Sequence, residues 1–336
     1  MSLFTDVPIA LGTTAATGRI IICVNRPDEA SGVVQHAAAI AEALGKHATL
    51  LHVIETRSTP GSHADPVEWE LRRREASQML ADLARGHDKT ISLETEVDNG
   101  FPADQICRRI SNTAADIVAI GASTMNDAPT RRLGNTVRQV LDLSTSSVLV
   151  VPRFEPAADA VVYRRILLPL DGSPRAESIL PLAVRIAEAH GAELVLLHVA
   201  QVPEMIEMGP SEPDDIAIRT RIMKRNERVA KKYLERIRAK LTARVPETRI
   251  RLCGHEDVRR CLVDLIAAER ADLVILSAKG RSAREDSSVG SVAAHLLDHV
   301  QVPILIARLE GRNTFRTVTR NEWNRPAVRL PGQFMS

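Results

Sequence analysis

Residues 165–171 read Arg-Ile-Leu-Leu-Pro-Leu-Asp, and residues 19–25, which lie 146 positions earlier, read Arg-Ile-Ile-Ile-Cys-Val-Asn. Both segments are apolar runs that start with arginine and end in a polar residue. The same offset of 146 carries Gly45 onto Gly191. A constant offset between similar segments is the sign of an internal repeat, so the chain contains two copies of one unit.

The similarity between the two copies continues downstream of these segments. Residues 51–53, Leu-His-Val, recur at 197–199 with the same offset. Residues 115–120 match 271–276 at an offset of 156, because the second copy has ten additional residues in its middle. We therefore expect two similar domains in tandem.

Each copy alternates short, β-branched apolar runs with longer segments of helical periodicity. This alternation is typical of a parallel sheet with crossover helices, and the continuous apolar runs indicate strands buried on both faces. We predict an α/β fold of two tandem, open, parallel five-stranded sheets flanked by helices. Strands are expected at 19–24, 48–54, 91–97, 116–121 and 147–152 in the first copy and at 165–170, 193–199, 247–253, 272–277 and 303–308 in the second.

Composition shifts mark the ends of the two copies. Residues 152–160 contain two prolines and three alanines without periodicity, which is typical of a linker. Residues 309–336 contain five arginines and three aromatic residues, and we favour a disordered tail there over an arm that docks on a partner. The expected division is an N-terminal tail at 1–17, a first domain at 18–153, a linker at 154–162, a second domain at 163–308 and a C-terminal tail at 309–336.

The 336 residues include 44 Lys and Arg against 42 Asp and Glu, a formal charge of +2. This near neutrality argues against a protein that coats nucleic acid or an anionic membrane. Ten Lys and Arg fall within 214–243, but a single aromatic residue, Tyr233, stands among them and supplies no series of rings for base stacking, so we expect a solvated helix and no specific nucleic-acid partner.

Cysteine use and the N-terminal sequence bear on the cellular compartment. Four cysteines without a Cys-x-x-Cys pair are too few for a disulfide framework in a chain of this length, which favours a reducing environment. The chain shows neither the charged start of a secretory signal nor an apolar run long enough to span a bilayer. We expect a cytoplasmic protein without a membrane partner.

Ligands of open α/β sheets bind at the carboxyl ends of the strands. In the second copy, Asp171 ends the first strand and can accept hydrogen bonds from ribose hydroxyls, while Val199 on the second strand can present backbone groups and an apolar surface to a base. Gly280 and Gly290 enclose nine residues after the fourth strand, and glycine lets backbone amides approach a phosphate closely. Ser291 adds a hydroxyl at the start of the next helix, whose dipole favours an anion.

These residues resemble the universal stress protein family, whose nucleotide-binding members carry an aspartate after the first strand and Gly-x2-Gly-x9-Gly-Ser/Thr after the fourth. The resemblance covers about 17–153 and 163–308 and implies the fold called adenine nucleotide alpha hydrolase-like. Ser277 departs from the motif, which has its first glycine there. The resemblance implies that ATP or another adenine nucleotide binds at Asp171, Val199, Ser277, Gly280, Arg281, Gly290 and Ser291.

The first copy departs further from the motif. Asn25 replaces the aspartate, Thr124 replaces the second glycine, and Asn135 replaces the Ser/Thr. An asparagine supplies no carboxylate, and the Cβ atom of a threonine obstructs close approach of the backbone. We expect a structural partner whose site is degenerate, with Asn25, Val53, Gly121, Thr124, Gly134 and Asn135 at the equivalent positions.

Two other groups of residues invite a catalytic or metal-binding interpretation. His52 and His198 occupy equivalent strand ends, and without a paired carboxylate we interpret them as residues that pack the sheet. Cys253, His255 and Cys261 supply three zinc ligands where a closed site needs four, so we favour buried thiols over a zinc site.

Our preferred interpretation is a stress-related regulatory module, not an enzyme, although weak ATP hydrolysis stays open. The second domain would bind the nucleotide, and the first would pack against it as an internal pseudo-dimer, or the chain would form a homodimer. Glu285 and Asp286 in the nine-residue loop would either weaken phosphate binding or hold a divalent ion such as Mg²⁺. The alternatives are a nucleotide-free interaction scaffold and a weak, Mg²⁺-dependent enzyme that hydrolyses ATP or adenylylates a substrate with these acids.

Overall fold

The computed structural model describes residues 18–55, 66–87, 91–122, 133–153, 160–201, 213–255, 257–281 and 287–308. Several sequence-based expectations lie outside these ranges, namely both predicted tails, residues 154–159 of the linker, Thr124, Glu285 and Asp286. None of the helices within the described ranges combines the length and the apolar character needed to cross a membrane.

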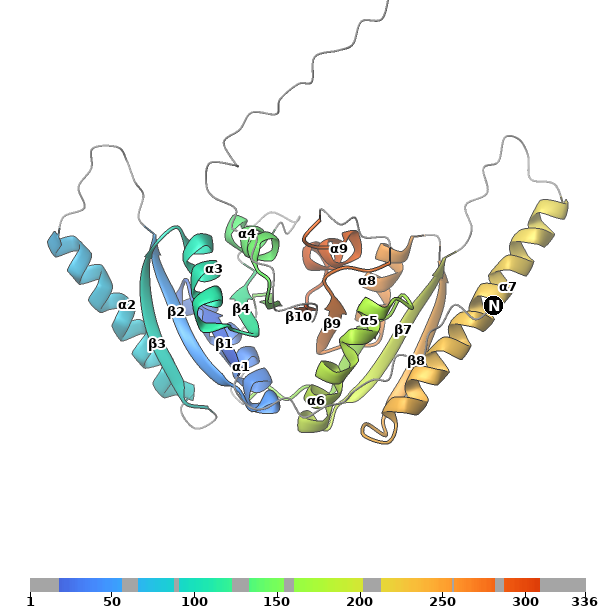
Figure 1. The fold of residues 1–336 in the computed structure, drawn as a ribbon, viewed down its shortest axis with the longest axis horizontal. Coiled ribbons are helices and arrows are strands. Elements are labelled where there is room, and N and C mark those ends of the chain that lie inside the picture. Colours follow the sequence, from blue (N-terminus) through green and yellow to red (C-terminus); the bar gives the residue numbers. More distant parts are fainter. Residues whose placement is uncertain are drawn as a thin grey trace, which may run out of the picture.

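Both copies follow the same order of strands and helices (Figure 1). The first copy contains β1 (Arg19–Cys23), α1 (Pro27–Leu44), β2 (His47–Glu55), α2 (Pro66–His87), β3 (Leu93–Gly100), α3 (Pro102–Thr113), β4 (Ile117–Gly121), α4 (Asn135–Leu143) and β5 (Ser147–Val151). The second copy contains β6 (Arg165–Pro169), α5 (Pro174–Ser178), α6 (Leu180–His190), β7 (Glu193–Gln201), α7 (Pro213–Leu241), β8 (Thr248–His255), α8 (Val258–Ala268), β9 (Leu273–Ser277), α9 (Ser291–His299) and β10 (Ile304–Ala307).

The ten strands form one sheet in the order β3-β2-β1-β4-β5-β10-β9-β6-β7-β8. Every pairing within a copy is parallel, which confirms the predicted pair of five-stranded parallel sheets. The two sheets join edge to edge through β5 and β10, which run antiparallel in the middle of Figure 1. This junction was not predicted from the sequence.

The register of the β5–β10 junction is symmetric. Leu149 pairs with Leu305, and these two residues are equivalents at the offset of 156. On either side, Val148 pairs with Ile306 and Val150 with Ile304. Self-pairing of equivalent positions is what a twofold axis between two like units requires. The pairing also covers the two strand edges that would otherwise expose unpaired backbone groups.

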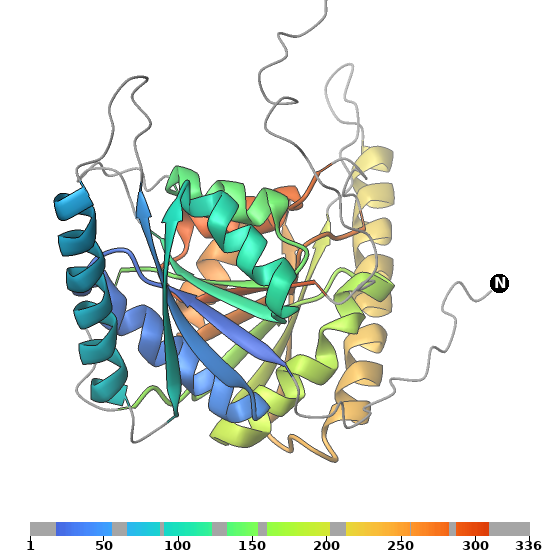
Figure 2. The ribbon, with the colours of Figure 1, turned by 60° about the vertical axis from the view of Figure 1, so that its left-hand side comes forward.

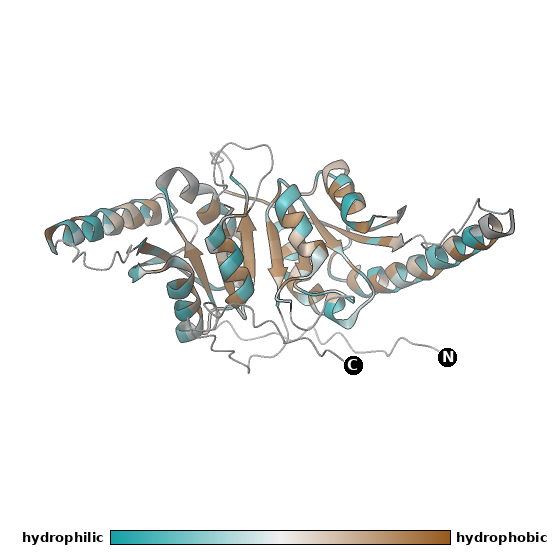
Figure 3. Cartoon of the chain, turned by 90° about the horizontal axis from the view of Figure 1, so that it is seen from above, coloured by the Kyte–Doolittle hydropathy of each residue, from teal (hydrophilic) through white to brown (hydrophobic). Residues whose placement is uncertain are grey.

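Two apolar layers cover the sheet, one on each face. Helices α1, α2, α5, α6 and α7 lie on one face and α3, α4, α8 and α9 on the other, as Figure 2 shows from a rotated view. Each layer includes buried residues of both copies. In Figure 3 the strands are brown and lie between helices whose outer surfaces are largely teal. The sequence places Ile, Val and Leu on both sides of each strand because both faces are covered.

Glycine ends the helix that leads into the second strand of each copy, α1 in the first and α6 in the second, at equivalent positions. Gly45 and Gly191 have φ angles of 61° and 63°, and their backbone amides donate back to carbonyl groups of the last helical turn. This left-handed conformation is unfavourable for residues with a Cβ atom. The two glycines therefore turn the chain toward β2 and β7 in the same way.

A buried aromatic cluster packs where α1 of the first copy meets α6 of the second. Tyr163 is fully buried, and its hydroxyl oxygen lies 3.0 Å from Nδ1 of His36. The ring of His190 meets Tyr163 edge-on at a centroid distance of 5.0 Å. Burial lowers the pKa of His36 to about 4, so the imidazole is neutral at pH 7.

We predict that His36 makes the protein acid-sensitive. Because the folded-state pKa lies below the ordinary value, stability is fully present above about pH 6.5 and falls as the pH drops toward 4, by at most about 3 kcal/mol. Replacing His36 by Leu, the residue at the equivalent position 182, together with Tyr163→Phe, should flatten this loss. Urea unfolding between pH 4 and 7 measures it.

The exposed histidine His47 provides a matched control, because His47→Gln removes an imidazole without changing the core. This variant should keep the acid dependence of the natural chain. An unchanged pH slope in the His36→Leu/Tyr163→Phe protein would show that the acid sensitivity arises elsewhere.

Candidate functional site

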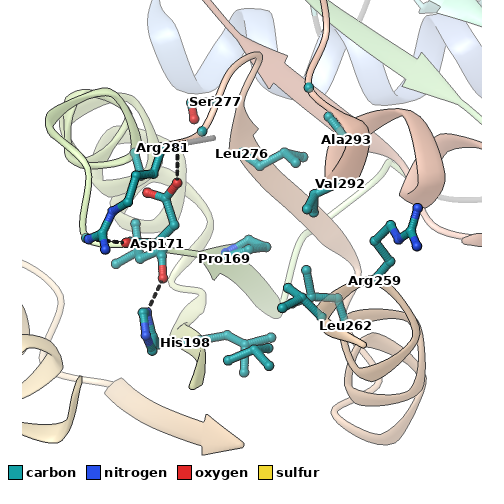
Figure 4. A pocket seen from close by; sticks show the side chains of 18 of the residues that line it. Pro169, Asp171, His198, Arg259, Leu262, Leu276, Ser277, Arg281, Val292 and Ala293 are labelled. Atoms are coloured by element: carbon teal, nitrogen blue, oxygen red, sulfur yellow. Dashed lines mark hydrogen bonds between the residues drawn. The ribbon is translucent and has the colours of Figure 1, made fainter. Parts of the chain in front are cut away.

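A cavity of about 1230 Å³ opens at the carboxyl ends of the strands of the second copy. It lies beside β6 and β9, where the strand order reverses, which is the usual ligand position in an open α/β sheet. The structure brings all seven residues predicted from the sequence to its lining, and Figure 4 shows part of the wall. These residues are Asp171, Val199, Ser277, Gly280, Arg281, Gly290 and Ser291.

Asp171 lies just beyond β6 and points its carboxylate at the segment that follows β9 (Figure 4). The Arg281 amide donates to Oδ2 at 2.6 Å, and the Ser173 amide donates to Oδ1 at 2.9 Å. Burial acts to raise the pKa of Asp171, but hydrogen bonds from Ser173 and Arg281 outweigh it and lower the pKa. The carboxylate is therefore ionised at neutral pH and retains capacity to accept further hydroxyl donors.

Gly280 is needed for the close approach of two chain segments. A Cβ atom at this position would lie 2.6 Å from Oδ2 of Asp171, so a larger residue would displace the carboxylate. The guanidinium group of Arg281 adds a second contact by donating to the backbone oxygen of Asp171 at 2.9 Å. The contacts between Asp171 and the segment after β9 thus hold the ends of β6 and β9 together.

Gly290 caps the N-terminus of α9, and its amide donates to the Ala278 carbonyl at 2.7 Å. A Cβ atom here would lie 3.5 Å from that carbonyl oxygen and 3.8 Å from the Gly280 nitrogen. Ser291, whose side chain is exposed, begins the helix beside this narrow gap. Free amides and the helix dipole at such a terminus favour an anionic group.

His198 has a structural contact that its equivalent in the first copy shares. Its Nδ1–H donates to the Leu170 carbonyl at 2.6 Å, and Nδ1–H of His52 donates to the Val24 carbonyl at 2.9 Å. Burial lowers the pKa of His198. Both histidines tie the end of one strand to its neighbour, as their interpretation as packing residues requires, and His198 also lines the cavity.

Two helices contribute cavity residues that the sequence motifs did not indicate. From α8 come Asp257, Val258, Arg259 and Leu262, and from α7 come Arg225, Asn226, Val229, Ala230 and Tyr233. The residues of α7 recur at four-residue spacing, so one helical face was readable from the sequence. The packing of this helix on β7 and β8, which brings that face to the cavity, was not. Arg225, Arg259 and Arg281 place three positive charges around the cavity.

The described positions of the first copy fall at equivalent places in the fold. Asn25 is exposed just beyond β1, Val53 is half-buried in β2, and Gly121 ends β4. Gly134 caps α4, and Asn135 is its first residue. The same scaffold therefore presents an amide where the second copy presents the Asp171 carboxylate.

The second copy brings two thiols together but no larger set of metal ligands. Sγ of Cys253 on β8 lies 2.9 Å from Sγ of Cys261 on α8, and both cysteines are free. Among the residues that the structure describes, no group of three or more His, Cys, Asp or Glu side chains could hold a metal ion. Cys261 is buried, as expected, whereas Cys253 is half-buried.

Comparison with known proteins adds to this geometry. The sequence model of the Universal stress protein family matches residues 17–152 and again 162–308. The chain belongs to the universal stress protein family. A universal stress protein of Mycolicibacterium smegmatis is 24% identical over 86% of this chain and 96% of its own length. One from Mycobacterium tuberculosis is 25% identical over 68% of this chain and 73% of its own length.

Solved structures share the two-copy fold of this universal stress protein. A universal stress protein from Archaeoglobus fulgidus aligns with a TM-score of 0.63 at 15% identity, covering 87% of this chain and 97% of that chain. A putative universal stress protein from Pseudomonas aeruginosa aligns with a TM-score of 0.61 at 15% identity, covering 87% and 93%. At this identity the similarity establishes the fold alone, and the ligand must be inferred from the residues of the site.

Proposed function

We propose that the second copy binds ATP or another adenine nucleotide and that the protein acts in the cytoplasm as a ligand-dependent regulatory module. The first copy would serve as its internal partner. One observation carries the proposal: the seven residues selected by sequence motif line a single cavity. In the sequence these residues lie as far apart as positions 171 and 291, so only the folded sheet brings them together at one end of its strands.

Each part of an adenine nucleotide finds suitable chemistry in this cavity. The ionised carboxylate of Asp171 would accept hydrogen bonds from ribose hydroxyls, and Val199 would present an apolar surface to the base. The amides of the first turn of α9, together with the hydroxyl of Ser291, would bind phosphate oxygens beside Gly280 and Gly290. Three arginines add positive charge, and the volume exceeds the range of about 300–1,000 Å³ that is common for small-ligand sites.

A regulatory role requires that the nucleotide prefer one arrangement of the protein over another. The cavity wall combines the strand ends with α7, α8 and the segment before α9. A ligand that contacts all of them would favour the conformation in which they are close together. The proposal is therefore binding coupled to conformation, without a chemical step.

We predict that the purified protein binds ATP with a dissociation constant below the millimolar range. Mass spectrometry of material released by denaturation identifies any nucleotide that copurifies, and calorimetric titration with ATP, ADP and AMP, with and without Mg²⁺, gives the affinities. Absence of binding to all three at millimolar concentrations would contradict the proposal and favour a nucleotide-free scaffold. Sustained phosphate release that is lost in Glu285→Gln or Asp286→Asn would instead indicate an enzyme.

We further predict that Gly290→Val weakens ATP binding at least about tenfold, or about 1.4 kcal/mol. The φ angle of −70° suits any residue, so the larger side chain fits the backbone but fills the gap beside Gly280. Gly290→Ala should have a smaller effect. Gly134→Val is the matched control at the equivalent helix cap of the first copy, where φ is −57°. Calorimetry should show equal ATP affinity for this control and the natural chain; equal losses in both would refute a single active copy.

A further inference from the structure

The segment that precedes α9 contacts both the cavity and the first copy. Ser287, Val289 and Gly290 line the cavity, whereas the lining does not include Ser288. The Ser288 hydroxyl instead donates to a carboxylate oxygen of Asp142, on α4 of the first copy. The first copy thus contacts the proposed phosphate-binding segment through a residue that does not line the cavity.

The backbone on both sides of Asp142 is held by the second copy. Arg308, just after β10, donates from its guanidinium group to the carbonyl oxygens of Leu141 and Ser144 at the end of α4. Its backbone amide donates to the Ser147 hydroxyl at 3.0 Å. Because the end of α4 is fixed by these contacts, Asp142 can act as a support for Ser288.

The junction contains the reciprocal contact, which provides an internal comparison. Asp298 on α9 is the equivalent of Asp142 at the offset of 156. Its Oδ1 atom lies 3.4 Å from the Leu133 amide nitrogen and 3.4 Å from the guanidinium group of Arg138. Each copy therefore holds the chain at the start of the other copy's last helix, but only in the second copy is the capping glycine followed by the serine of the motif, Ser291.

We propose that Asp142 of the first copy is a positioning residue that sets the phosphate affinity of the second-copy site. This inference rests on the proposed nucleotide binding. Amides can bind phosphate without an ordering cost only when their segment is already held in the bound geometry. The hydrogen bond from Ser288 to Asp142 supplies that restraint from outside the cavity. The ribose and base contacts do not depend on it.

The test compares ATP with adenosine, which lacks the phosphates. Asp142→Ala should weaken ATP binding about tenfold, as expected for loss of a hydrogen bond to a charged group, and change adenosine binding less than twofold. Ser288→Ala should have the same effect, and the double variant should lose no more than either single one. Asp142→Asn, which retains an acceptor oxygen, should restore most of the ATP affinity. Asp298→Ala is the matched control and should bind both ligands like the natural chain.

Several outcomes would overturn the proposal. Equal losses of ATP affinity in Asp142→Ala and Asp298→Ala would indicate general damage to the junction. Additive losses of affinity in the double variant would show that Asp142 and Ser288 act independently. Hydrogen exchange of the ligand-free protein separates this idea from nucleotide binding: Asp142→Ala, but not Asp298→Ala, should speed exchange of the amides at 287–293. Unchanged exchange refutes the restraint, whereas faster exchange without any nucleotide binding refutes only the proposed function.

A second, independent inference concerns the thiols of Cys253 and Cys261. Sγ of Cys261 donates its hydrogen to Sγ of Cys253 at 2.9 Å, about 0.9 Å longer than a disulfide bond. Cys253 is half-buried and is the more accessible of the two sulfurs, whereas burial, followed by the contact with Cys253, raises the pKa of the buried Cys261 to about 12. The two sulfurs join β8 to α8, whose Val258, Arg259 and Leu262 line the cavity.

We propose that Cys253 and Cys261 form a disulfide on exposure to a hydroperoxide. The Cys253 thiolate attacks one peroxide oxygen, the O–O bond breaks, and the other oxygen leaves as an alcohol, or as water from hydrogen peroxide, after taking up a proton. The Cys261 sulfur then attacks the resulting Cys253 sulfenic acid, releasing its proton and expelling water. Two thiols are oxidised, and one peroxide is reduced.

Intact-mass spectrometry after stoichiometric hydrogen peroxide should show the loss of two hydrogen atoms and protection of two thiols from alkylation, both reversed by dithiothreitol. Cys253→Ser and Cys261→Ser should each abolish the change. Cys107→Ser is the matched control and should leave it intact. Peptide mapping that finds both thiols free, or each carrying oxygen without a cross-link, would refute the pair.

Discussion

The antiparallel pairing of β5 with β10 is the contact on which the arrangement of the two copies depends. It satisfies the backbone groups of two strand edges at once and centres on the equivalent residues Leu149 and Leu305. With this register set, α1 meets α6 on one face of the sheet, and α4 and α9 each reach the loop of the other copy on the opposite face. The two apolar layers then extend through both copies.

A symmetric scaffold carries an asymmetric pair of sites. Both copies place a histidine and a helix-capping glycine at equivalent positions. The difference lies in chemistry: the second copy presents the Asp171 carboxylate, whereas the first presents the neutral amide of Asn25. Because α4 and Arg308 link the copies directly, the first copy contributes to the surroundings of the second-copy cavity.

Close packing at the cavity limits which residues can occupy it. Gly280 approaches the Asp171 carboxylate so closely that a methyl group would collide with it. The same carboxylate accepts the Arg281 amide, so a single side chain orders the segment after β9. The Arg281 amide thus fixes the shape of the segment and, together with the hydrogen bonds from Ser173, favours the ionised form of Asp171 despite burial.

The sequence alone determined the repeat, the succession of strands and helices along each copy and the residues at the strand ends, because these depend on local apolar patterns and on glycine at tight approaches. Strand bounds agree to within a few residues, as for 165–170 against Arg165–Pro169. Only the tertiary structure decided the β5–β10 junction, the α7 and α8 walls of the cavity and the contact between Asp142 and Ser288. These join residues distant in the chain, and their pairing depends on how whole layers pack, which no local pattern encodes.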